Sequence, residues 1–287
     1  MRFCFSATFS APDELVALAR AGDEAGWDTL TVSDHLINPV ATRRPYPYTA
    51  DGSRRWGMGT PWPDPWVTIG HLSAVTERLR FLTTVYILPA RMPAHVAKQV
   101  GTAAVLSGNR VSLGVGMGWM EEEFEASGTP FGKRGKRADE MIELLRALWT
   151  GEVVEHHGDH FDLPPLEMLP APTEPVPVVV GGVSEAALRR AARNDGWVSD
   201  LHTIDELGEI CRKLHAYRAE IGRDDAPFAI YGSARDAWDL DGYRRLADVG
   251  VTHLVTMPWY FYAGAEADVQ GKVDGIRRFA EDVIARW

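Results

Sequence analysis

Short apolar segments alternate with longer amphipathic segments along almost the whole chain. The clearest amphipathic segment spans 134–150, where Met141, Leu144, Leu145 and Leu148 recur at the spacing of one helix face. Such alternation is typical of βα units, whose strands run parallel. The apolar segments predict eight strands, at 2–9, from Asp28 onward, and at 81–87, 110–116, 177–182, 196–199, 228–233 and 252–257.

Helical segments lie between the predicted strands. The first follows Ser10 and Pro12, which are typical helix-start residues, and ends at Gly26. Eight βα units with right-handed crossovers close naturally into one parallel barrel. We therefore predict a single α/β domain over residues 1–287, a (β/α)8 TIM barrel with an extended loop after strand 2 and a small hairpin insertion before strand 5. The other helices are expected at 64–77, 94–107, 134–150, 184–194, 203–221, 240–249 and 266–286.

Two connections exceed the usual length of about 4 to 6 residues. The segment 36–63 is rich in proline, glycine and aromatic residues. Two interpretations of it stay open: a lid or substrate wall, and a surface insertion that contacts another subunit. The segment 152–176 has an alternating pattern, which predicts the hairpin. The aromatic residues of the first segment include Tyr46, Tyr48, Trp56 and Trp62.

Composition and charge narrow the kinds of molecule that the chain is expected to bind and the compartment in which it is expected to act. With 287 residues, of which 45% are hydrophobic, the chain can bury a large core. A formal net charge of −10 argues against a nucleic-acid partner, because nucleic-acid binding relies on concentrated lysine and arginine. Cys4 and Cys211 are far apart and suggest neither a disulfide framework nor a zinc cluster. No segment has the pattern of a secretion signal or a membrane span, so we expect a cytoplasmic protein.

Candidate chemistry begins after the second predicted strand, where Asp34 and His35 follow DTLTVS. Barrel active sites lie at the carboxyl ends of strands, so both residues are expected at the rim. His35 is the candidate for proton transfer, because imidazole exchanges a proton near neutral pH. A structural rim histidine is the alternative. Neighbouring strand residues point to opposite faces, so only a turn would bring Asp34 into the same site.

Glycines mark the end of the fourth predicted strand. Gly114, Gly116 and Gly118 precede Trp119 and remove side chains where a flat ligand or a phosphate would approach the backbone. A tightly packed strand whose glycines make room for protein neighbours explains the same pattern. The spacing is not that of a dinucleotide fingerprint, and the chain has no phosphate-loop motif.

A second glycine-containing turn, Gly181, Gly182, Val183 and Ser184, follows the apolar run PVVV and leads directly into a predicted helix. The amino-terminus of a helix offers free backbone N–H groups and a macrodipole that favours phosphate. Ser184 is placed to cap this helix and also to donate to a ligand. A plain tight turn with a serine cap is the alternative.

Other chemistries have weaker support. The run HHGDH at 156–160 lacks a helix that would fix its histidine spacing, and neither HExxH nor a paired CxxC accompanies it, so no metal site is predicted. Without a GxSxG motif, nucleophilic hydrolysis is disfavoured. Glutamates at 121–123 and 125 suit glycoside chemistry, but a solvated helix start is the commoner explanation. The basic run 133–137 is expected to be solvated, with one arginine able to reach an anionic cofactor tail.

Several longer motifs together resemble the luciferase-like monooxygenase superfamily, especially its deazaflavin-dependent branch that uses coenzyme F420. They occur in the right order and cover most of the chain, which makes them more specific than a glycine triplet. The motifs are TVSDH (31–35), ILPARMPAHVAKQ (87–99), LSGNRVSLGVGMGW (106–119), EEEFEASGTPFGKR (121–134), ADEMIELLRALWTG (138–151) and VVVGGVSEAALRRAARNDGW, which ends at 197.

The resemblance implies a barrel whose mouth binds a reduced deazaflavin or flavin, with coenzyme F420 as the expected cofactor and FMN as the alternative. The strand at 81–87 matches one whose bulge often backs the cofactor ring, sometimes through a non-proline cis peptide. The phosphate is implied at the turn 181–184, and His35 matches a position associated with proton transfer or substrate contact. The implied cofactor contacts are Asp34, Thr83, Thr84, Val85, Gly118, Trp119, Gly181, Gly182, Val183 and Ser184.

We therefore hypothesise an oxidoreductase that transfers a hydride between coenzyme F420 and a small, partly apolar organic substrate, with His35 as the proton donor. Some relatives carry a catalytic glutamate soon after the glycines, where this chain has Trp119, and this disfavours a sugar-phosphate dehydrogenase. The alternatives are an FMN-dependent, oxygen-using monooxygenase, a non-catalytic deazaflavin-binding protein and a metal-dependent hydrolase. Neither a nucleic acid nor a membrane is an expected partner, and a homo-oligomer is left open.

Overall fold

Parallel strands form a closed ring in the computed structural model, which describes residues 1–287. Nine strand segments share one sheet, and β3 and β4 are two parts of one barrel strand, so the barrel has eight strands. The ring closes where β3 pairs with β5, with Phe81 opposite Val111. The predicted (β/α)8 barrel is thus confirmed. The segments are β1 (Arg2–Ser6), β2 (Thr29–Val32), β3 (Arg80–Thr83), β4 (Tyr86–Ile87), β5 (Val111–Gly116), β8 (Val178–Gly181), β9 (Gly196–His202), β10 (Ala229–Ala234) and β11 (His253–Thr256).

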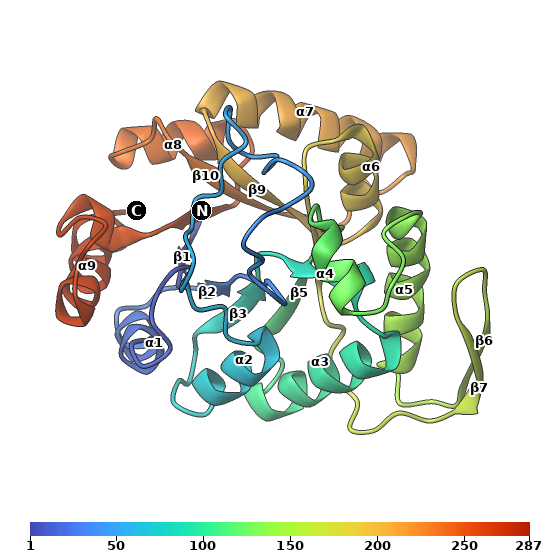
Figure 1. The fold of residues 1–287 in the computed structure, drawn as a ribbon. Helices are drawn as coiled ribbons and strands as arrows, with labels where there is room; N and C mark the ends of the chain where they lie inside the picture. Colours follow the sequence, from blue (N-terminus) through green and yellow to red (C-terminus); the bar gives the residue numbers. More distant parts are fainter.

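Helices surround this barrel (Figure 1). Each predicted helix is present, with its ends shifted by a few residues. A further short helix, α4 (Glu121–Ala126), follows β5 in the segment for which the sequence suggested only a solvated helix start. The main helices are α1 (Leu15–Glu24), α2 (Pro65–Ser73), α3 (Pro93–Ser107), α5 (Arg134–Leu148), α6 (Glu185–Arg193), α7 (Ile204–Glu220), α8 (Leu240–Asp248) and α9 (Val269–Asp282).

The third barrel strand is interrupted, where the sequence predicted one continuous strand. Between its paired positions, residues 83–85 face only residues 113–114 of β5, so this strand carries one extra residue, as in a β-bulge. The hydroxyl of Thr83 accepts from Gly114 N–H at 2.9 Å and donates to Gly114 C=O at 2.7 Å. The Thr83 side chain thus bonds the backbone of β5 at the point where the backbone hydrogen bonds between the two strands are interrupted. The Thr84–Val85 peptide is cis, as the resemblance implied.

Two apolar layers hold the fold together. The barrel interior is filled by a small buried cluster that includes Cys4, Leu82, Val179, Val198 and Tyr231. A much larger cluster lies between the barrel and its helices, as expected when apolar helix faces cover a parallel sheet. No helix is both long enough and apolar enough to cross a lipid bilayer.

Both long connections have the form that the sequence predicted. The segment 36–63 joins β2 to α2 and lies across one end of the barrel (Figure 1). The hairpin consists of β6 (Val154–His157) and β7 (Asp162–Leu166), which pair antiparallel and project beside α5 (Figure 1). The carboxylate of Glu140 on α5 accepts from the backbone N–H groups of His160 and Phe161, which ties the hairpin tip to the barrel.

Candidate active site

His35 and Glu123 form a pair at the carboxyl end of the barrel. His35 follows β2, and Glu123 lies on α4, which follows β5. Nδ1 of His35 is 3.0 Å from Oε1 of Glu123, and the same oxygen accepts from Leu36 N–H at 2.8 Å. The side chain of Glu123 is fully buried and that of His35 is 11% exposed. A carboxylate can hold the ring through Nδ1–H, which leaves Nε2 available for another hydrogen bond.

Sequence reasoning missed the role of Glu123. The run of glutamates at 121–123 and 125 predicts only a solvated helix start, and three of the four glutamates do bond loop residues at the surface. Glu123 instead packs beside buried Phe124 on the inner side of α4, and its Oε2 has no hydrogen-bond partner in the protein. No local sequence signal separates Glu123 from the adjacent acids, because its partner lies 88 residues away.

Asp34 points away from His35, as expected for neighbouring residues near the end of a strand. Its Oδ1 accepts from Arg91 at 2.8 Å and its Oδ2 accepts from Ile87 N–H at 2.9 Å. Burial raises the pKa of Asp34, while the Arg91 guanidinium opposes that shift. Both carboxylate oxygens of Asp34 therefore bond protein groups beneath the mouth. Arg91 is a second residue whose role the sequence did not indicate. Contact between Asp34 and a cofactor stays a prediction.

Aromatic rings of the long loop enclose the imidazole of His35. The ring centroids of Trp56 and Trp62 lie 4.8 Å and 4.7 Å from that of His35. Tyr46 packs edge-on against Trp56 at 5.2 Å and against Trp119 at 5.5 Å, which connects the loop with the residue after the glycines. The structure therefore brings His35 and Trp119 to one aromatic wall and favours the lid or substrate-wall interpretation of segment 36–63.

Ion pairs fix the loop to the barrel rim. Arg44 Nε donates to Glu121 on α4 at 2.5 Å, and Arg43 bonds Glu125 on the same helix. At the other side of the mouth, Arg55 makes two bonds to Asp200 on β9, at 2.6 Å and 2.8 Å. These contacts join the loop to the barrel rim on two sides of the mouth.

The floor of the mouth is formed by the bulge. The half-buried side chain of Val85 lies between two glycines: a Cβ on Gly116 would be 2.4 Å from its Cγ2, and one on Gly181 would be 2.8 Å from its Cγ1. A Cβ on Gly118 would be 2.7 Å from Phe124. The glycines thus make room for protein neighbours and set the shape of the floor.

The predicted phosphate turn lies at the start of α6. Gly182 has a φ of +110°, a conformation that L-residues rarely adopt. Ser184 is the N-cap of α6, and its Oγ accepts from Ala187 N–H at 3.3 Å. Val183 and Ser184 are exposed, so the remaining N–H groups of the first turn are accessible to an anion.

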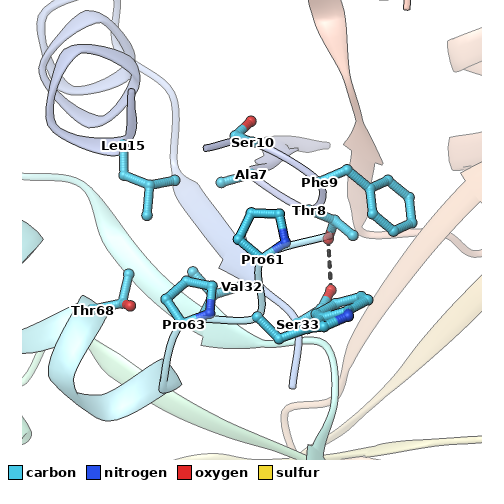
Figure 2. A pocket seen from close by; sticks show the side chains of 11 residues that line it. Ala7, Thr8, Phe9, Ser10, Leu15, Val32, Ser33, Pro61, Pro63 and Thr68 are labelled. Atoms are coloured by element: carbon cyan, nitrogen blue, oxygen red, sulfur yellow. Dashed lines mark hydrogen bonds between the residues drawn. The ribbon is translucent and has the colours of Figure 1, made fainter. Parts of the chain in front are cut away.

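A small cavity lies beside the aromatic wall, between the ends of β1 and β2 and the loop (Figure 2). Phe9, Pro61 and Pro63 border it, and a hydrogen bond of 2.6 Å joins the hydroxyls of Thr8 and Ser33. None of its 11 lining residues carries a charged side chain. The cavity is therefore apolar with a few hydroxyl groups.

The other charged residues that the sequence suggested as candidates lie apart from the His35–Glu123 pair and the aromatic wall. His156 pairs with Glu140, and His157 pairs with Asp162 and Glu155, so the hairpin histidines bond nearby carboxylates. No group of three or more histidine, cysteine, aspartate or glutamate side chains is arranged to hold a metal ion. In the basic run, Arg134 Nε donates to Gly118 C=O at 3.0 Å and so supports the floor.

Comparison with known proteins identifies the class to which this barrel belongs. The sequence profile of the luciferase-like monooxygenase family matches residues 3–271, so the chain belongs to that family. The uncharacterized protein Rv0940c of Mycobacterium tuberculosis is 42% identical over the full length of both chains. The F420-dependent hydroxymycolic acid dehydrogenase of the same organism is 29% identical, over 96% of this chain and 71% of its own. Family and relatives support an oxidoreductase.

Solved structures share the fold. An F420-dependent secondary alcohol dehydrogenase in complex with an F420-acetone adduct superposes with a TM-score of 0.76 at 18% identity, over 99% of this chain and 98% of its own. The oxygenating constituent of 3,6-diketocamphane monooxygenase from Pseudomonas putida, in complex with FMN, has a TM-score of 0.65 at 18% identity, over 96% and 84%. At these identities the likeness shows the fold alone.

Proposed function

We propose that this protein transfers a hydride between coenzyme F420 and a small, partly apolar organic substrate at the mouth of the barrel. When bound, reduced F420 would supply the hydride that an electrophilic carbon of the substrate accepts. The observation that carries the proposal is the pair formed by His35 and the buried Glu123 beneath an aromatic wall. The F420-dependent relatives support the choice of cofactor.

The residues at the mouth fit a flat ring with a phosphate tail. Val85 offers an apolar surface on the bulge, flanked by Gly116 and Gly181, which carry no side chains. The α6 amino-terminus at Ser184 offers free N–H groups to the phosphate. Trp119 stands at the opposite edge of the wall, in contact with Tyr46. These residues would hold and orient the cofactor, which is the main contribution of a protein to cofactor chemistry.

His35 would deliver the proton that accompanies the hydride. When His35 is protonated, both ring nitrogens carry hydrogen, and Glu123 stabilises the cation through Nδ1–H. Loss of the Nε2 proton to a developing alkoxide leaves a neutral ring that still donates from Nδ1 to Glu123. Trp56 and Trp62 shield this transfer from water, which strengthens the interaction between donor and oxyanion.

Titration of the protein with F420 and with FMN tests the cofactor. We expect F420 to bind with one-to-one stoichiometry and at least about tenfold more tightly than FMN, a difference of about 1.4 kcal/mol. Gly182→Ala should weaken F420 binding, because alanine strains the turn at φ +110°. The matched control is Gly222→Ala, at φ +66° after α7 with no neighbour near the added methyl group. Tighter binding of FMN would contradict the proposal.

An FMN-dependent monooxygenase is the second candidate. The family to which the chain belongs and the FMN-bound structural neighbour favour it, and the shielded mouth suits either cofactor. Oxygen consumption by protein with reduced FMN and a ketone distinguishes the candidates. Stoichiometric uptake of oxygen into the product would support the monooxygenase, whereas anaerobic turnover with reduced F420 supports the dehydrogenase.

A further inference from the structure

The substrate side of the mouth is aromatic. Rings continue from Tyr46 through Trp56 and Trp62 to Phe9, whose centroid lies 5.8 Å from that of Trp62. Phe9 is 40% exposed and has a φ of +67°, in the left-handed region that a phenylalanine rarely occupies. Backbone strain of this kind persists where the surrounding structure enforces it, often at binding sites. Phe9 thus extends the aromatic wall at a conformational cost.

Every cation of the loop already has a partner. Segment 36–63 contains four arginines and neither lysine nor a further histidine. Arg43 and Arg44 bond glutamates of α4, and Arg55 bonds Asp200 through both terminal nitrogens. Arg54 donates to Asn38 Oδ1 and Pro39 C=O, each at 2.8 Å. No guanidinium of the loop is left to neutralise an anionic substrate.

The cavity beside Phe9 and Trp62 also offers no charged group to a substrate. Its polar groups are hydroxyls, and its remaining lining is apolar, with no charged side chain among the residues in contact (Figure 2). With about 20 Å³ of accessible space, the cavity is too small for a ring, so it adds uncharged surface to the wall and does not itself hold a substrate. A carboxylate or phosphate packed against this surface would lose its hydration without gaining a cation from it, and this cost is several kcal/mol for an unpaired buried charge. A neutral ring system would lose little.

We propose that this mouth selects an uncharged, ring-bearing ketone or alcohol whose ring packs against Trp62 and Phe9, and that it rejects substrates carrying a carboxylate or a phosphate. The inference rests on the proposed function for the reaction at the carbonyl group. The selectivity itself comes from the wall and the paired arginines, so binding alone can measure it. Failure of hydride transfer and failure of this selectivity are therefore separate results.

Binding of matched ketones tests the selectivity. The probes are 2-acetylnaphthalene and 6-acetyl-2-naphthoate, which differ by one carboxylate, measured by tryptophan fluorescence with oxidised F420 bound so that no ketone is reduced. We expect the neutral ketone to bind at least about tenfold more tightly. Trp62→Ala should weaken its binding about tenfold, in keeping with the stacking area removed. Equal or tighter binding of the carboxylate would overturn the proposal, as would failure of the neutral ketone to bind at millimolar concentration.

A charge variant tests the paired arginines. Asp200→Asn removes the carboxylate partner of Arg55, and we expect the preference for the neutral probe to fall about fivefold, because the freed guanidinium then pairs with 6-acetyl-2-naphthoate. The control is Glu24→Gln, which removes the partner of Arg277 near the amino-terminal end of the barrel and should leave the preference unchanged. An unchanged preference in Asp200→Asn would contradict the role assigned to the paired arginines.

Discussion

Two histidines at opposite ends of the barrel occupy contrasting environments. At the carboxyl end, His35 pairs with the Glu123 carboxylate beneath tryptophan rings of a loop. At the amino-terminal end, His253 stacks on Tyr231 at 4.2 Å, and the side-chain partner of its Nδ1 is the Thr252 hydroxyl at 2.7 Å. The ring of His35 is bonded directly to a carboxylate, whereas that of His253 is bonded to a hydroxyl, and burial outweighs the more distant charge of Asp28. This difference is why we propose His35, and not His253, as the proton donor.

The largest expected effect concerns turnover. His35→Ala should lower the anaerobic rate of ketone reduction with F420 by about 10²- to 10⁴-fold, the range for loss of a general acid. His253→Phe keeps the stacking on Tyr231 and should leave this rate within about twofold, because it is remote from the mouth. Cofactor titration of both variants controls for folding. Full turnover in His35→Ala would remove His35 from the mechanism.

The next effect concerns stability against acid. Burial, the largest cause, lowers the pKa of His253 to about 4 from 6.5, so the unfolded chain binds a proton that the folded chain excludes. Stability should therefore fall as the pH decreases from 6.5 toward 4, by up to ~3 kcal/mol from this residue. Urea denaturation at several pH values measures the free energy of unfolding. In His253→Phe the loss of stability that His253 causes between pH 6.5 and 4 should disappear. If the free energy of unfolding depended on pH as in the unmodified protein, His253 would not be the cause.

A smaller effect on turnover is expected when His35 loses its carboxylate partner and, like His253, has only neutral hydrogen-bond partners for its ring. Glu123→Gln keeps an acceptor for Leu36 N–H but removes the carboxylate that stabilises imidazolium, and turnover should fall about 10- to 100-fold. Steady-state kinetics should show the loss in kcat more than in KM. The matched control is Glu125→Gln on the same helix, whose exposed side chain should change kcat less than about threefold.

The smallest expected effect concerns the floor beneath His35. Gly116→Ala would place a methyl group 2.4 Å from Val85 and should destabilise the fold by about 1–3 kcal/mol through overpacking. Thermal denaturation measures this change. Gly57→Ala in the loop has no atom within 4 Å of the added methyl and should have little effect on the Tm. Equal effects at the two positions would show that the floor is not tightly packed.

The barrel could be predicted from the sequence because each strand is an apolar run and each helix has an apolar face. The bulge could not be located from the strand pattern, since it depends on Thr83 bonding Gly114 across the sheet. The resemblance did imply it. Glu123 could not be separated from its neighbours, because helix α4 is short and its inner face is defined only by contact with His35. Tertiary pairing, rather than local pattern, decides these features.

Transfer of deuterium from the cofactor to the product would demonstrate hydride transfer by this protein. Reduced F420 carrying two deuterium atoms at C5 would be incubated anaerobically with the protein and 2-acetylnaphthalene, and the product alcohol analysed by mass spectrometry. We expect one deuterium on the carbinol carbon of the product, at a rate that His35→Ala reduces. An unlabelled alcohol, or a product that forms only in air and contains an added oxygen atom, would contradict hydride transfer from F420.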